Sequence, residues 1–329
     1  MTADEDAISP ETGLSPRRRM YYGKGDVWVF RTFAEPLEVT PIPESAYTGC
    51  RNTVIGANLS IAVSGEAFLS SFTDGDNRLV VATDSMKNFI LRHTAQYTGA
   101  AIDGLLAFIG RRLLETYPQM TGVRLEAVHV PFEEMQLPDD PAAAGNPLVF
   151  KVSRNEAPVS KVICIRDERG IRVSEHAGGI TGLRLLKVKG SSFAGYVKDE
   201  YTTLPETADR PLYIFLDVWW AYTDSEDALE ACRMRYVAAE QIRDLAAAVF
   251  HELHSPSIQH LIYRIGLRIL ERFPQLSEVW FESNNRTWET VTEETATGRG
   301  GVFTEPRPPF GFQGFSVSRE DLAAAGGGG

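Results

Sequence analysis

The segment Ile102-Asp-Gly-Leu-Leu-Ala-Phe-Ile-Gly-Arg-Arg-Leu-Leu-Glu-Thr-Tyr-Pro-Gln recurs 156 residues later as Ile258-Gln-His-Leu-Ile-Tyr-Arg-Ile-Gly-Leu-Arg-Ile-Leu-Glu-Arg-Phe-Pro-Gln. Half of the positions are identical, and in both copies apolar residues recur every three to four positions. This spacing predicts an amphipathic helix in each copy, ended by Pro118 and Pro274. The chain is therefore expected to contain a duplicated unit.

Each predicted helix carries a glycine at the same place, Gly110 and Gly266. Glycine in a helix interior costs about 1 kcal/mol relative to alanine. We therefore expect both glycines to allow close packing against another backbone.

Segments of alternating polarity follow both helices, at residues 123–130 and 279–283, as half-buried strands require. Further strand-like runs lie ahead of the helices, at residues 27–31, 58–63, 78–82, 183–189 and 212–220. The pattern predicts an α+β fold, with antiparallel sheets and helices packed on one face.

The predicted organisation is a flexible tail over residues 1–19, a first unit over 20–155, a second unit over 156–319 and a flexible Gly-rich tail over 320–329. The boundary is placed within or shortly after the Asp-Asp-Pro-Ala-Ala-Ala-Gly-Asn stretch at residues 139–146.

The composition restricts the possible partners. A net charge of -11 and a pI of about 5.1 argue against nucleic-acid binding and against a polybasic membrane protein. No apolar run approaches the roughly 20 residues that cross a bilayer. The odd number of cysteines (Cys50, Cys164 and Cys232) indicates no disulfide framework and fits a reducing cytoplasm. A peroxisomal Ser-Lys-Leu ending is also absent from this sequence. We expect a cytoplasmic protein with a small-molecule partner.

Four short segments remain once the repeat is set aside: Tyr22-Gly-Lys-Gly, Val81-Ala-Thr-Asp-Ser-Met-Lys-Asn, Gly190-Ser-Ser-Phe-Ala-Gly-Tyr-Val-Lys-Asp-Glu-Tyr-Thr-Thr-Leu with Arg210 behind it, and Ser257-Ile-Gln with Ser283-Asn-Asn-Arg-Thr. Judged alone, Asp84 or Ser85 is a helix N-cap and Lys24 a solvated charge. In the same way, Phe193 is a core aromatic and Arg210 a salt-bridge partner of Asp209 or Glu206.

Together and in this order, the segments resemble those of the uricases. The ending Phe303-Thr-Glu-Pro-Arg-Pro-Pro-Phe-Gly-Phe-Gln is similar to bacterial members, and the likeness runs from about Tyr22 to about Val317. The resemblance implies two tandem tunnelling-fold (T-fold) units per chain and a homotetramer. It also implies active sites at subunit interfaces, with Lys24 and Thr83 coming from one chain and most urate-binding residues from its neighbour.

The resemblance further implies a reaction: oxidation of urate by O2 and water to 5-hydroxyisourate and H2O2, without a cofactor. Lys24 and Thr83 would relay the proton. Phe193 would stack on the purine, while Arg210 and Gln259 would bind its two edges. The backbone at Asp84 and Ile258 would complete the contacts, and Asn285 would hold oxygen and then water above the ring.

The sequence departs from the family at one position. Two residues after the asparagine many uricases have a histidine that completes the relay, and here the residue is Thr287. A hydroxyl passes a proton but has no pKa near neutrality. Either Thr287 acts with an ordered water, or another group such as His129 replaces the histidine, or activity is reduced.

Two alternatives are kept. In the first, the chain is another T-fold enzyme for a purine or pterin, although such enzymes usually anchor the ring with a carboxylate and Gln259 stands here. In the second, the chain is a non-catalytic purine-binding tetramer, because the histidine is missing. The histidines His251, His254 and His260 lack the carboxylate pattern of a metalloprotease, so we expect solvated histidines at the entry to a helix and no metal.

Overall fold

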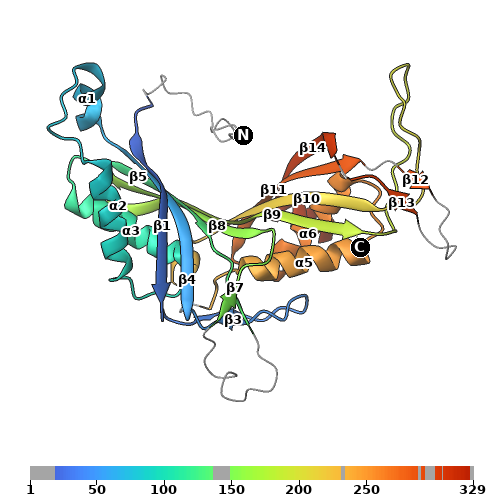
Figure 1. Cartoon of the computed structure of the whole chain (residues 1–329), viewed down its shortest axis with the longest axis horizontal. Coiled ribbons are helices and arrows are strands. Elements are labelled where there is room, and N and C mark those ends of the chain that lie inside the picture. The colour runs from blue at the N-terminus through green and yellow to red at the C-terminus, as the bar shows by residue number, and fades with distance from the viewer. Residues whose placement is uncertain are drawn as a thin grey trace, which may run out of the picture.

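The computed structural model describes residues 19–135, 149–230, 234–287, 290–292, 301–305 and 307–326. Eight long strands form one antiparallel sheet in the order β1-β4-β5-β8-β9-β10-β11-β14 (Figure 1). Their bounds are Tyr22–Thr32, Val54–Ser64, Gly122–His129, Ala157–Asp167, Gly170–Lys187, Leu212–Tyr222, Leu276–Thr287 and Arg307–Ser318. Four main helices accompany the sheet: α2 (Thr83–Thr94), α3 (Ile102–Thr116), α5 (Ala239–Glu252) and α6 (Ile258–Arg272).

The smaller elements lie in the connections. They are the pairs β2–β3 (Leu37–Glu38, Gly49–Cys50), β6–β7 (Glu133–Glu134, Phe150–Lys151) and β12–β13 (Thr290–Thr292, Val302–Phe303), with helices η1 (Glu66–Phe68), α1 (Leu69–Thr73), α4 (Glu226–Leu229) and α7 (Arg319–Gly326). No helix among the described residues is long and apolar enough to cross a membrane.

The duplicated unit is visible in the order of the long elements. Two strands, two helices and two strands occur twice, first as β1, β4, α2, α3, β5, β8 and then as β9, β10, α5, α6, β11, β14. In this order β8 ends the first set and β9 begins the second, and the turn between them is at residues 168–169. The predicted boundary at residue 155 lies just ahead of β8 and stays a prediction, and residues 139–146 lie outside the described part of the chain.

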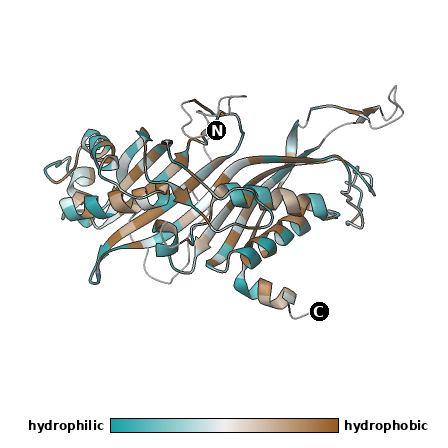
Figure 2. Ribbon diagram, turned by 90° about the horizontal axis from the view of Figure 1, so that it is seen from below, coloured by the Kyte–Doolittle hydropathy of each residue, from teal (hydrophilic) through white to brown (hydrophobic). Residues whose placement is uncertain are grey.

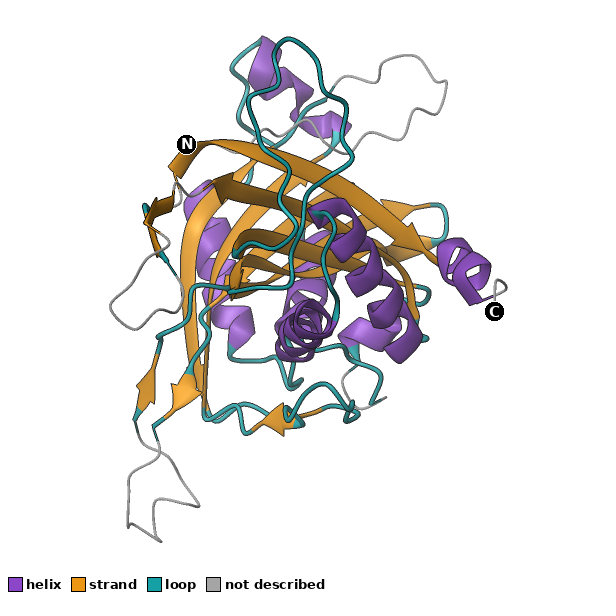
Figure 3. Ribbon diagram, turned by 90° about the vertical axis from the view of Figure 1, so that its right-hand side faces the viewer, coloured by secondary structure: helices purple, strands orange, loops and turns teal. Residues whose placement is uncertain are grey.

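The main helices cover one face of the sheet (Figure 3). Inward side chains of β10 are buried at every second residue from Leu212 to Tyr222, as an antiparallel strand with one covered face requires. The helices carry apolar residues toward the sheet and polar residues outward (Figure 2). On the opposite face Trp28, Phe30 and Val128 are exposed. The α+β class and the one-sided packing predicted above are confirmed.

Gly110 and Gly266 lie where the helices approach the sheet most closely. A Cβ on Gly110 would meet the Sγ of Cys164 at 2.6 Å, and one on Gly266 would meet a methyl of Val317 at 2.5 Å. The close packing is therefore present in both units. It is made against strand side chains, whereas a neighbouring backbone was expected.

Three local predictions were wrong. Residues 78–82 form a turn and an irregular stretch instead of a strand, because Val80 bonds back to Asn77 and Arg78 pairs with Asp76. Helix α2 begins at Thr83 with Ala82 as its N-cap, so neither Asp84 nor Ser85 caps it. The predicted C-terminal tail contains α7, which Asp321 fastens by accepting bonds from the Ser318 amide and hydroxyl.

The two units share a backbone irregularity. The β1–β4 pairing shifts register between Lys24 and Val27, and Asp26 has a φ of 58°. The β9–β10 pairing shifts at the corresponding place, where Gly182, 156 residues after Asp26, has a φ of 75°. Such bulges redirect the side chains beside them.

Candidate active site

Lys24 points toward the helix-covered face of the sheet. It lies opposite Ile61 of β4, which is buried, and residues opposite each other in antiparallel strands share a face. The preceding residue has to be glycine, because a Cβ on Gly23 would lie 1.8 Å from the Ile61 carbonyl oxygen. The bulge that follows places the half-buried Lys24 near the edge of this face.

Thr83 is the first residue of α2, which packs on β1. The approach to the helix is held by Tyr22, whose hydroxyl accepts a 2.9 Å hydrogen bond from the Val81 amide. Ala82 offers no side-chain cap, so the amides of the first turn are available to a ligand. Strand β1 thus contains both Lys24 and, two residues earlier, Tyr22, which fixes the segment that leads to Thr83.

Asp84 is exposed and forms an ion pair with Lys87 at 2.6 Å. The hydrogen bond from Lys87 is the main cause that lowers the pKa of Asp84, and the charge of Lys24 lowers it further. Lys24 is thus close enough to the start of α2 for its charge to act there. The structure therefore places Lys24 near the first turn of α2, which begins with Thr83 and Asp84.

Phe193 and Arg210 meet in the long connection between β9 and β10. The guanidinium carbon of Arg210 lies 5.7 Å from the centre of the Phe193 ring, which stacks on Tyr196 at 4.9 Å. Desolvation lowers the pKa of Arg210, and within the described residues its buried Nε has no hydrogen-bond partner. A partly desolvated cation beside an aromatic face suits a planar anion.

A bridge between Ser191 and Ser255 ties this connection to the start of α6. The Ser192 amide donates to Ser255 O at 2.9 Å, and the Ser255 amide donates to Gly190 O at 3.0 Å. Two residues later Ser257 caps α6, its hydroxyl accepting from the His260 amide.

The first two residues of α6 are the predicted urate contacts Ile258 and Gln259. Ile258 is buried, whereas Gln259 is exposed. The bridge to Ser255 therefore brings both residues to the Phe193 and Arg210 end of the unit.

Asn285 lies on the same face and at the same end. It is opposite the buried Ile214, which places it on the helix-covered side of β11. Gly266 contacts Phe281 of β11. From this contact, the helix runs back eight residues from Gly266 to Ile258, and the strand runs on four residues from Phe281 to Asn285. Each of these paths spans about 12–13 Å in the same direction. The predicted purine-binding residues of the second unit are thus gathered at one end.

The two groups of residues are far apart within one chain. Lys24 is in β1 and Asn285 in β11, with five strands between them. Strands are about 4.8 Å apart, so the separation is on the order of 30 Å along the sheet. A single chain does not assemble the whole constellation.

The two candidates for the relay histidine are not placed near Lys24. His129 lies opposite Ala57, whereas Lys24 lies opposite Ile61, and the ring of His129 is bonded to Ser160 at 2.9 Å. The backbone of Thr287 is in β11, paired with Arg307. Thus His129 does not replace the histidine within the chain.

The described residues contain no group of three or more His, Cys, Asp or Glu side chains placed to hold a metal ion. His251, His254 and His260 are exposed, and the ring of His254 is 3.1 Å from the Ser192 hydroxyl.

The comparison with known families decides the assignment. The family model described as Uricase matches residues 21–161 and 176–313. The chain belongs to the uricase family. The unmatched residues between the two parts surround the β8–β9 turn, where the sheet divides into its two units.

Individual uricases are similar to this chain along most of its length. The chain is 51% identical over 306 residues to a uricase of Haloferax volcanii, covering 92% of this chain and 99% of that one. It is 50% identical over 317 residues to the uric acid degradation bifunctional protein PucL of Bacillus subtilis, covering 96% of this chain but 64% of that one. The chain thus spans less than two thirds of the bifunctional relative.

Solved uricase structures share the fold. A crystal structure of a uricase from Bacillus fastidious matches with a TM-score of 0.88 and 54% identity, covering 93% of this chain and 96% of that one. A hyperthermostable mutant of the urate oxidase of Bacillus sp. TB-90 matches with a TM-score of 0.87 and 48% identity, covering 92% of this chain and 100% of that one. The fold expected from the resemblance to uricases is confirmed.

Some supporting residues of the site were not predicted. Tyr22 orders the approach to Thr83, Tyr196 backs the Phe193 ring, and the buried Ser191 joins the loop to α6. All three lie in the segments that resemble uricases. The contacts of Tyr22 and Ser191 link residues distant in sequence, so no local pattern indicates them, whereas Tyr196 lies three residues after the ring that it backs.

Proposed function

We propose that this uricase-family protein oxidises urate with O2 and water to 5-hydroxyisourate and H2O2, without a cofactor, as a cytoplasmic homotetramer. The observation that carries this proposal is the division of the candidate residues into two half-sites, one with Lys24 and Thr83 and one with Phe193, Arg210, Gln259 and Asn285. Each half-site has the chemistry that the other lacks.

The second half-site supplies the binding chemistry. Phe193 offers a flat apolar face, and Arg210 a planar fork of donors for two charge-assisted bonds to the urate anion. The amide of Gln259 presents both a donor and an acceptor to the opposite edge, with the Ile258 backbone beside it. The buried Nε of Arg210, which has no hydrogen-bond partner in the part of the chain that the structure describes, supports a ligand with acceptor atoms at this place.

The first half-site supplies the proton chemistry. Lys24 takes the proton from urate through the Thr83 hydroxyl, and the amides at the start of α2, including that of Asp84, stabilise the anion that forms. The electron-rich urate dianion then gives two electrons to O2, which leaves as H2O2 after taking up two protons. Asn285 holds O2 and then the water whose oxygen adds to C5, and Thr287 with an ordered water takes the place of the relay histidine.

The open sheet supports assembly from two chains. Its edge strands are β1, which carries Lys24, and β14, which is paired to the Asn285 strand β11. An edge strand presents unpaired backbone groups to another chain. Placing β1 of one chain beside β14 of the next brings Lys24 within about two strand spacings of Asn285.

The junction inside each chain supports the same arrangement. A shift of 156 residues relates Thr83 to Ala239 and His129 to Asn285. Ala239 and His129 line one pocket, at the place where the second unit follows the first. Repeating this junction between chains therefore sets Thr83 of one chain beside Asn285 of the next.

The enzyme assay tests the function. Purified, chelator-treated protein is mixed with urate while oxygen consumption and the ultraviolet band of urate are followed. We expect both to fall together, and Lys24→Met to stop turnover while urate still binds. Absence of oxygen consumption by the wild-type protein would contradict the proposal.

Subunit complementation tests the shared site. Lys24→Met and Arg210→Ala chains should each be inactive, but together they form sites with both intact halves. Random mixing in pairs with two shared sites predicts recovery to about a quarter of the wild-type rate. A control mixture of Lys24→Met with Thr83→Val chains should stay inactive, because both changes affect the same half-site. Equal turnover rates in the two mixtures would contradict the shared-site arrangement.

A further inference from the structure

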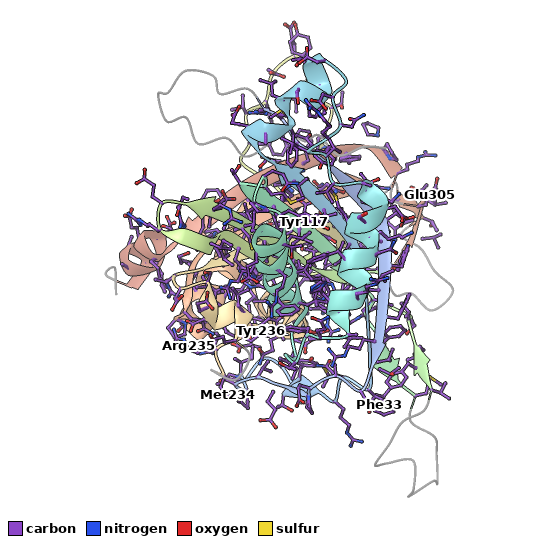
Figure 4. The ribbon with its side chains drawn as sticks, turned by 90° about the vertical axis from the view of Figure 1, so that its left-hand side faces the viewer. Phe33, Tyr117, Met234, Arg235, Tyr236 and Glu305 are labelled. Atoms are coloured by element: carbon purple, nitrogen blue, oxygen red, sulfur yellow. The ribbon has the colours of Figure 1, made fainter. Side chains whose placement is uncertain are left out.

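A pocket of about 540 Å³ lies at the junction of the two units. Its walls include the aromatic rings of Tyr47, Phe132 and Tyr236, together with His129 and Glu240. Tyr236 follows Met234 and Arg235 in the segment that leads to α5 (Figure 4). The volume is within the range of pockets that hold small organic ligands.

The repeat relates this pocket to the proposed urate site. The 156-residue shift places Asp103 at the position of Gln259 and His129 at that of Asn285. His129 and Ala239, the counterparts of Asn285 and Thr83, both line the pocket. The pocket is therefore the first unit's counterpart of the purine-binding half-site.

The proton-transfer pair is missing from this counterpart. The shift that relates the units places Ile180 at the position of Lys24, and Ala239 at that of Thr83. The recurring bulge at Gly182 shows that the surrounding backbone is nevertheless the same. Ala239 lines the pocket, so a ring bound here meets a methyl group where the urate site has the hydroxyl of Thr83, and the buried Ile180 offers no base.

The charged side chains in and beside the pocket form pairs of opposite charge. Arg154 pairs with Glu240 at 2.9 Å, and Arg243 lies beside Glu156 at 3.5 Å. Within the described residues the buried Nε of Arg154 has no hydrogen-bond partner, although Glu156 is 3.8 Å away. Among the described residues that line the pocket, acidic and basic side chains are equal in number, so this lining offers both donors and acceptors without a net charge.

The carboxylate of Asp103 does not itself line the pocket, but Tyr236, which does, donates its hydroxyl to it. Asp103 is buried, and its two oxygens take hydrogen bonds from His176 at 2.7 Å and from the Tyr236 hydroxyl at 2.9 Å. The carboxylate at the position of Gln259 is thus already satisfied. The ligand that fits is uncharged, flat and bordered by amide-like donors and acceptors.

We propose that the junction pocket is a second, non-catalytic binding site for a neutral planar nitrogen heterocycle of purine size. All the described residues that line the pocket belong to one chain, so the site does not depend on the assembly of the urate site. Aromatic walls stack on the ring, and the Arg154 and Glu240 pair meets its edge.

Equilibrium dialysis of the full-length protein with hypoxanthine tests this site. Urate under anaerobic conditions keeps the proposed urate site occupied, and we expect one hypoxanthine per chain that urate does not displace. Phe132→Ala should weaken this binding about tenfold, since it removes a stacking face. Turnover of urate should be unchanged in that variant, and the exposed Phe72→Ala serves as the matched control.

Two results would overturn the proposal: no hypoxanthine bound, or binding that urate displaces and Arg210→Ala abolishes. If Phe132→Ala does not fold, Ala239→Leu narrows the pocket from the opposite side and should also exclude hypoxanthine. A protein that binds hypoxanthine at the junction but does not oxidise urate would refute the proposed function alone.

Discussion

The hydroxyl of Tyr22 accepts a hydrogen bond from the amide of Val81, joining the strand of Lys24 to the helix of Thr83. The ring of Tyr22 also packs edge-on against Phe68 at 5.1 Å. One tyrosine thus fixes the relative position of two elements that must act together. The distance between Lys24 and Thr83 therefore depends on the Tyr22–Val81 hydrogen bond, which neither of the two residues makes.

Replacing Tyr22 by phenylalanine should therefore reduce turnover more than stability. The ring packing remains, but the half-buried Val81 amide loses its acceptor, which costs about 1–2 kcal/mol. We expect kcat to fall while KM for urate changes little, because the binding residues lie on the other half-site. Steady-state kinetics with a urea unfolding curve separate the effects, and an unchanged kcat would show that the contact is not needed.

The glycine contacts predict a cost in the core. Gly110→Ala should lower the free energy of unfolding by about 1–3 kcal/mol, because the overpacking against Cys164 exceeds the gain in helix propensity. The double change with Cys164→Ala makes room and should recover most of that loss. If the double variant is no more stable than the single one, the contact is not the cause. Thermal or urea unfolding at fixed protein concentration gives both values.

Thr287→His tests the departure from the family sequence. An imidazole titrates near neutrality, so it offers an acid and a base that the hydroxyl lacks. We expect a higher kcat together with a new inflection near about pH 6–7 in the pH-rate profile. The matched change Thr287→Val should lower kcat without that inflection. Identical profiles for the wild-type and histidine proteins would show that this position does not join the relay.

The junction pocket predicts a loss of stability in weak acid. Burial lowers the pKa of His129 despite the opposing charges of Asp103 and Glu240. Because the unfolded chain then binds a proton more readily, stability falls as the pH drops through the unfolded histidine value of about 6.5. His129→Gln should remove this step between about pH 6.5 and 5. Unfolding curves at several pH values check this, with the exposed His260→Gln as the comparison.

A second acid-sensitive group lies deeper in the same junction. Burial would raise the pKa of Asp103, but the hydrogen bond and charge of His176 outweigh it, so the pKa is lowered. The stabilisation that the Asp103 carboxylate contributes is fully present above the pKa of about 3.9 of an unfolded aspartate. It is lost as the pH falls below that value. Asp103→Asn should therefore destabilise the protein at neutral pH, and the difference from wild type, measured by urea unfolding, should shrink below about pH 4.

Local features of the fold were predictable from the sequence. The two repeat helices show a helical period, and their prolines fall just beyond the last helical residues, Thr116 and Arg272. The sequence did not indicate which strands pair with one another when they lie far apart along the chain. Strand β8 lies between β5 and β9 in the sheet and pairs with both, and residues 78–82 resemble a strand but have no strand beside them.

The candidate residues divide in the same way. Lys24 and Thr83 were grouped through a resemblance, and the structure explains their proximity by the packing of α2 on β1. The junction pocket follows from how the units pack, which no motif in either unit reveals. Comparing the two repeats residue by residue is the signal that leads from the sequence to that pocket.

The bulge shared by β1 and β9 separates the shape of the backbone from its chemistry. Asp26 and Gly182 hold the same left-handed backbone 156 residues apart, yet the residue two before each is Lys24 in one unit and Ile180 in the other. The same kink thus accompanies a charged side chain in one copy and an alkyl side chain in the other. At this place the two copies differ in the residue that the backbone presents and agree in the backbone itself.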